Sequence, residues 1–98
     1  MGFVQIIEFK TSNIDEMRKI SDEFEAATQG KRTATRMTLC EDRDRPGTYV
    51  QMVEFPSYEE AMKNSELPET QEISKKLQSL AGGSATFRNL EVIDLREI

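Results

Sequence analysis

Two glutamines stand at matching places in a repeated seven-residue segment. Gln5 lies in residues 3–9 (FVQIIEF), and Gln51 lies in residues 49–55 (YVQMVEF). Both segments are rich in aromatic and β-branched residues, so each predicts a strand. On a strand, each amide shares a face with the aromatic residues at the two ends of its segment. A buried amide needs a hydrogen-bond partner, which a ligand, a trapped water or the other amide can supply.

Tyr49 and Asn64 are the other candidates for polar contacts with a ligand. Tyr49 begins the second repeat, and its phenol can exchange a proton or stack on an aromatic molecule. Asn64 precedes Pro68, which interrupts a predicted helix and so re-aims the side chains beside the break. A simple helix cap is the alternative role for Asn64. The candidate ligand-binding residues are therefore Gln5, Tyr49, Gln51 and Asn64, and the sequence identifies no catalytic residue.

Glu8 and Glu54 also repeat in register, on the strand face opposite the glutamines. They can form a carboxylate pair for metal binding or acid–base chemistry. We favour salt bridges to Arg36 or Arg88 across a subunit interface. Cys40 is the one cysteine, and we expect it to be a buried, unreactive thiol.

The composition excludes several classes of function. The chain has no histidine, which removes Ser–His and Cys–His nucleophile pairs and His-ligated zinc or haem. We therefore expect no cofactor, no His-ligated metal and no degradation of haem. The net charge of −5 argues against nucleic acid and against an anionic membrane as partner. A single cysteine and the absence of any apolar run near ~18 residues lead us to expect a cytoplasmic protein.

Helix signals follow both repeats. Asn13 can cap a first helix, with Glu16 three residues later. Ser57 and Glu60 form a full capping box that opens a second helix. That helix breaks before Pro68, which suits the first turn of a new helix that ends at a pair of glycines.

Two more strands, predicted at residues 33–40 and 85–95, complete the order β-α-β-β-α-β. Residues 1–98 thus predict a single α+β domain of the ferredoxin-like type, in which a four-stranded antiparallel sheet carries both helices on one face. The repeated segments would form the two central strands. Both faces of these strands are partly apolar, and hydrophobic residues make up only 37% of the chain. We therefore expect a homodimer in which the sheets of two copies pack together.

The arrangement resembles the dimeric α+β barrel superfamily and, within it, the antibiotic-biosynthesis-monooxygenase-like proteins. The topology matches along nearly the whole chain, and the most specific part is residues 55–68 (FPSYEEAMKNSELP). The resemblance implies a ligand pocket inside each subunit, between the helices and the sheet. It also implies that Asn64 stands where relatives often carry a pocket histidine, and Gln5 where they carry a first-strand amide. The superfamily includes cofactor-free oxygenases of polycyclic phenols and haem-degrading enzymes.

The function that these observations favour is binding of a small apolar or aromatic molecule, in a protein related to the monooxygenases. One alternative is a cofactor-free monooxygenase or isomerase acting on an aromatic or polyketide-like substrate, with Tyr49 near the reacting centre. A second alternative is a non-catalytic structural dimer. The lack of histidine, tryptophan and an activated nucleophile favours binding over catalysis. The predicted cavity lies between the helices and the sheet face that carries Phe3 and Tyr49.

Overall fold

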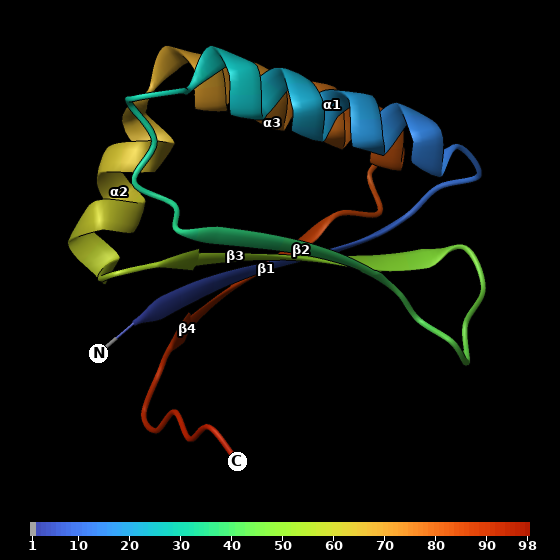
Figure 1. Ribbon diagram of the computed structural model, residues 1–98. Coiled ribbons are helices and arrows are strands. Elements are labelled where there is room, and N and C mark those ends of the chain that lie inside the picture. Colours follow the sequence, from blue (N-terminus) through green and yellow to red (C-terminus); the bar gives the residue numbers. More distant parts are fainter. Residues whose placement is uncertain (1) are drawn as a thin grey trace.

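A computed structural model describes residues 2–98. The elements are β1 (Phe3–Lys10), α1 (Ile14–Ala27), β2 (Arg36–Glu41), β3 (Thr48–Phe55), α2 (Tyr58–Glu66), α3 (Pro68–Ala81) and β4 (Thr86–Glu91). The strands form one antiparallel sheet in the order β2-β3-β1-β4. The helices lie over one face of the sheet, and no helix lies over the other in the described residues (Figure 1). This is the predicted ferredoxin-like fold, with the two repeats as the central strands.

The helix ends follow the predicted local signals. The side-chain oxygens of Asn13 and Ser57 each accept a hydrogen bond from the backbone N–H three residues later, at 3.3 and 3.2 Å. Leu67 is extended, and Pro68 then begins α3, so the predicted break separates α2 from α3. Gly82 ends α3 in the left-handed conformation, with φ of 58°. None of the helices in residues 2–98 is long and apolar enough to cross a membrane.

Because the two central strands, β1 and β3, are antiparallel, the first residue of each repeated segment lies opposite the last residue of the other. Phe3 lies opposite Phe55, and Phe9 lies opposite Tyr49. The side chains at these two ends belong to separate core clusters, one built on Phe3 and Phe55 and the other on Phe9 and Met17. The middle of the same face, where the glutamines stand, therefore lies between two packed ends.

β4 is shorter than the strand predicted at residues 85–95. It ends at Glu91, which lies opposite Phe3, the first residue of the strand it pairs with. One hydrogen bond follows, from the backbone N–H of Val92 to the carbonyl of Gly2 at 2.9 Å, and the chain then leaves the sheet. Ile93 and Leu95 consequently lie outside the sheet, with 84% and 80% of their surfaces exposed. This explains why the apolar residues change phase along the segment.

The sequence predicted that this strand begins at Thr33, but in the structure β2 begins at Arg36. The backbone N–H of Thr33 donates to Oδ1 of Asn64 at 3.2 Å, and the Thr33 hydroxyl donates to the carbonyl of Glu60. Thr33 is thus bound to α2 rather than paired in the sheet. These two contacts hold the loop before β2 against α2.

The ion pairs on the open face of the sheet and the exposure of Cys40 differ from what the sequence predicted. Glu54 pairs with Arg36 at 3.6 Å within one chain, because the register places the two residues opposite each other, so this bridge does not need a second subunit. Glu8 pairs with Arg45 from the β2–β3 turn, also at 3.6 Å. Cys40 is exposed rather than buried in the single chain, because it lies on the open face of an edge strand.

Candidate functional site

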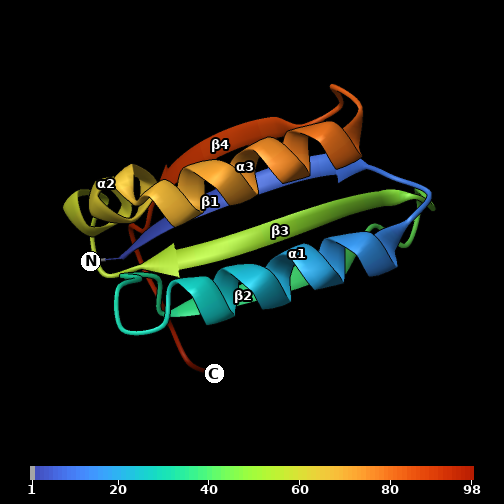
Figure 2. The ribbon, with the colours of Figure 1, turned by 90° about the horizontal axis from the view of Figure 1, so that it is seen from above.

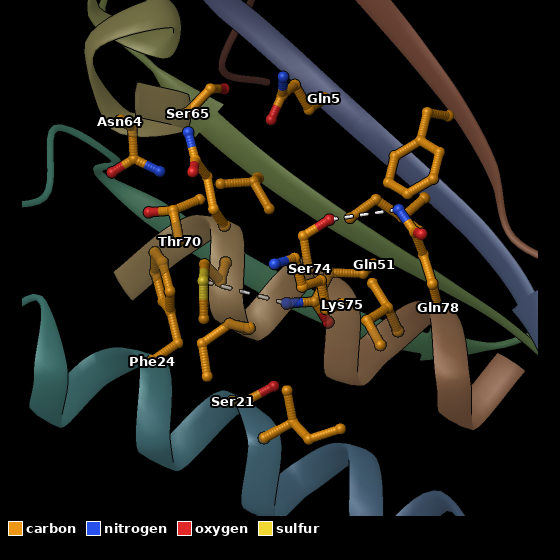
Figure 3. A pocket seen from close by; sticks show the side chains of 18 of the residues that line it. Gln5, Ser21, Phe24, Gln51, Asn64, Ser65, Thr70, Ser74, Lys75 and Gln78 are labelled. Atoms are coloured by element: carbon orange, nitrogen blue, oxygen red, sulfur yellow. Dashed lines mark hydrogen bonds between the residues drawn. The ribbon is translucent and has the colours of Figure 1, made fainter. Parts of the chain in front are cut away.

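A cavity of ≈ 570 Å³ lies between the helices and the sheet. Its volume falls within the range of small-molecule sites, roughly 300–1,000 Å³. All four strands and all three helices contribute side chains to its wall. Figure 3 shows the labelled polar side chains of β1, β3, α2 and α3 gathered around this space, with Phe24 and Ser21 of α1 on the opposite side. The cavity occupies the place that the sequence predicted for it.

The wall combines apolar and neutral polar side chains. Of its twenty residues, ten are hydrophobic, nine are amides or hydroxyls, and one, Lys75, is charged. The buried apolar residues of the wall come from α1, β3 and α3: Met17, Ile20, Phe24, Val53, Phe55 and Leu77. This composition suits a mainly apolar molecule that makes a small number of hydrogen bonds.

Gln51 is one of the two buried polar residues among those that line this wall. It lies in the middle of β3, on the face covered by helices, and only 5% of its surface is exposed. Nε2 lies 4.0 Å from Sδ of Met37, which is a weak acceptor. Oε1 is buried and accepts no hydrogen bond from any group in residues 2–98. A buried acceptor without a partner costs about 1–3 kcal/mol, and this oxygen can accept a hydrogen bond from an O–H or N–H group that enters the cavity.

Gln5 also lines the cavity but uses its amide differently. Its Nε2 donates to Oδ1 of Asn89 on β4 at 3.3 Å. In the register of β1 and β3, Gln5 lies opposite Val53, whereas Gln51 lies opposite Ile7. The two glutamines are therefore offset along the strands, and their amides have separate partners. Both amides line the helix-covered space.

Asn64 joins the cavity to the loop before β2. It is 4% exposed and stands near the end of α2, two residues before the helix ends. Its Oδ1 accepts the hydrogen bond from the backbone of Thr33, which leaves its NH₂ group on the side of the cavity. Asn64 thus combines a structural contact with a place in the wall (Figure 3).

Tyr49 does not line the cavity, contrary to the sequence-based expectation. Its ring stacks on Phe9, with ring centroids 5.8 Å apart, at the packed end of the sheet. Burial raises the pKa of the Tyr49 phenol, and the negative charge of Glu41 raises it further. The phenol therefore stays protonated near neutral pH, away from the space that a ligand would fill.

The contribution of α3 was missed by the sequence-based prediction. Thr70, Ser74 and Gln78 all line the cavity, and the buried Oγ1 of Thr70 has no hydrogen-bond partner in the described part of the chain. These residues are four apart, so they fall on one face of the helix. The signal that could have revealed them is a row of neutral polar residues where a helix covering a sheet normally carries apolar ones.

Among residues 2–98, no three His, Cys, Asp or Glu side chains are grouped closely enough to hold a metal ion. The cavity wall itself contains amides, hydroxyls and one ammonium group as its polar components.

Comparisons with known proteins find similar structures but no similar sequences. No family model matches the sequence, and no curated protein matches it in sequence. SnoaB, a cofactor-independent oxygenase from Streptomyces nogalater, solved as a point mutant, has a similar structure with a TM-score of 0.80 and 14% identity, covering 96% of this chain and 95% of that one.

Two further solved structures give the same result. Rv0793 from Mycobacterium tuberculosis has a TM-score of 0.77 and 15% identity, covering 99% of this chain and 100% of that one. A protein described as an antibiotic biosynthesis monooxygenase has a TM-score of 0.72 and 16% identity, covering 96% and 100%. The chain therefore has the ferredoxin-like α+β fold of the antibiotic biosynthesis monooxygenase structures.

Proposed function

We propose that the protein binds a small, mainly apolar or aromatic molecule in the cavity, with Gln51 as its principal hydrogen-bonding residue. The observation that carries the proposal is the buried Oε1 of Gln51, which lacks a donor in residues 2–98 and belongs to the wall of a ligand-sized space. A ligand O–H or N–H directed at this oxygen would remove the cost of burying it. Gln5 and Asn64 would add weaker contacts.

The proposal is binding rather than catalysis because of the chemistry of the wall. Among the lining residues there is no carboxylate, thiol, phenol or imidazole, and the exposed Lys75 is the one titratable side chain of the wall. Cofactor-independent oxygenation is the second candidate function. It is favoured by the structural similarity to SnoaB, which is a cofactor-independent oxygenase. In that case the cavity would position the substrate and exclude water.

A thermal-shift screen with aromatic and quinone-like compounds tests the binding function. A ligand that binds only the folded protein at 100 times its Kd adds about 2.7 kcal/mol of stability. The variant Gln51→Leu removes the buried oxygen at nearly constant volume and should weaken binding about tenfold, the effect of one lost hydrogen bond. Gln29→Leu is the matched control, because Gln29 is exposed and lies outside this cavity.

The two functions separate in the next step of the same experiment. Oxygen uptake with a compound that binds would assign oxygenase activity, whereas binding without consumption would leave the binding function. If no compound in a broad aromatic series raised the melting temperature, both functions would be contradicted. A purely structural role would then remain.

We further propose that two copies associate through the open face of the sheet. The centre of this face is apolar and partly exposed in the single chain: Val4, Ile6, Val50, Met52 and Leu90. The ion pairs of Glu54 with Arg36 and of Glu8 with Arg45 lie around it. An apolar centre within a charged rim is the usual anatomy of a subunit interface.

Light scattering at micromolar concentration tests this association. The unmodified protein should have the mass of a dimer, and Met52→Glu should be monomeric, because it places a charge in the apolar centre. Ala26→Glu introduces the same charge on the exposed side of α1 and should remain dimeric. A monomeric mass for the unmodified protein, unchanged at higher concentration, would contradict the association.

A further inference from the structure

The exposed part of the cavity wall lies between α3 and β4. The lining residues classed as exposed are Gln71, Lys75 and Gln78 of α3 and Phe87 of β4. Seen from above, α3 runs beside β4, which lies at the edge of the sheet without a helix over it (Figure 2). The mouth of the cavity is therefore bounded by three long polar side chains on one side and an aromatic ring on the other.

Lys75 is the charged residue in this mouth, and its charge is not neutralised by an ion pair within residues 2–98. The next residue, Lys76, points elsewhere and pairs with Glu23 of α1 at 2.6 Å. No carboxylate of the described residues belongs to the cavity wall, although the chain has 18 acidic residues and a net charge of −5. In an acidic protein, the wall of this cavity thus has a positive charge and no negative one.

We propose that the ligand is amphipathic, with an apolar or aromatic body inside the cavity and one anionic group at the mouth, against the Lys75 ammonium. This inference rests on the proposed binding function and adds the charge of the ligand to it. A carboxylate, sulfonate or ionised phenol at the mouth would stay partly hydrated while it faces the ammonium, so burial costs little. The amides of Gln71 and Gln78 can donate to the same group. A cationic ligand would meet repulsion at the mouth.

Two fluorescent probes with one ring system test the proposal. Anilinonaphthalene sulfonate carries an anionic group, and phenylnaphthylamine is its uncharged counterpart. Titration at low ionic strength should show both probes binding to the unmodified protein. Lys75→Gln should weaken binding of the sulfonate about 1.5-fold to fivefold, the range for a partly solvated ion pair, and should leave the affinity for the uncharged probe unchanged.

Lys19→Gln is the matched control, because Lys19 is exposed on α1, lies outside the cavity and changes the net charge equally. It should alter neither affinity. A Lys75→Gln variant that binds both probes like the unmodified protein, or loses both equally, would overturn the anionic ligand while leaving the binding function in place. Failure of both probes to bind the unmodified protein would overturn the binding function itself, and the anionic ligand with it.

Discussion

The two faces of the sheet use alternate residues of the same repeat for different purposes. The aromatic and glutamine side chains of the repeat point to the face under the helices. Phe3, Phe9 and Phe55 are each at most 3% exposed there. The apolar side chains of the repeat that point to the open face stay partly exposed in the single chain: Val4, Ile6, Val50 and Met52. The chain's own helices cover the first face, whereas a second copy of the chain would cover the open face.

The covered face is also less uniform than the open one. Its aromatic residues pack at the two ends of the central strands, and its glutamines stand between them. Several helix positions over this middle region carry small polar side chains, namely Ser21, Thr70 and Ser74. The hollow thus results from short side chains placed where large apolar ones would have joined the two core clusters.

The largest expected effect is on folding stability, which should depend on the covered face, whereas the open face should affect dimer formation. Phe9→Ala should lower the free energy of unfolding by about 3–5 kcal/mol, because Phe9 is 1% exposed in the core. Ile6→Ala, on the open face, should instead weaken dimer formation. Urea unfolding and sedimentation of both variants measure this difference. Equal losses of folding stability, with unchanged association in both variants, would remove the distinction between the faces.

A second prediction concerns the cost of the unpartnered amide. Gln51→Met should raise the stability of the unliganded protein by about 1 kcal/mol, because it replaces a buried acceptor without a partner in residues 2–98 by a thioether of similar size. Ligand binding should fall in the same variant. Chemical denaturation with and without ligand measures both effects. A loss of stability would indicate that Oε1 is satisfied in solution by a bound water.

Much of this contrast could be predicted from the residues. The repeat identified the central strands and the face of Gln5 and Gln51, because strand periodicity and aromatic content depend on local sequence. The helix break before Pro68 followed from proline chemistry. Tyr49 was misplaced because its face was known but its position along the cavity was not. The share of α3 in the wall depends on how the helix is rotated over the sheet, which is decided by packing.

A smaller effect is expected at the rim of the open face. The carboxylate of Glu54 lies 3.6 Å from the guanidinium of Arg36, and both are partly exposed. The coupling of this pair should be at most about 1 kcal/mol in the single chain. A double-mutant cycle with Glu54→Gln and Arg36→Gln measures it. A larger coupling that depends on protein concentration would show that the pair is covered by a second copy.

The smallest effect is a titration in the β2–β3 turn, beside the open face. Hydrogen bonds from the Arg45 side chain and then from the backbone of Asp44 hold the pKa of Asp42 below its usual value. The stabilisation is therefore present at neutral pH and is lost as the pH falls through this lowered pKa. Carboxyl NMR titration should show that Arg45→Ala returns the pKa towards the ordinary value. An unchanged Asp42 pKa in this variant would contradict the assigned cause.

The most direct test of the ligand cavity is an NMR titration of the ¹⁵N-labelled protein with phenylnaphthylamine. We predict that the side-chain amide signals of Gln51 and Asn64 and the backbone signal of Thr70 shift with one common affinity, while the side-chain signal of exposed Gln29 stays in place. Shifts confined to open-face residues such as Val4 and Met52, with the Gln51 signal unmoved, would contradict binding in the cavity.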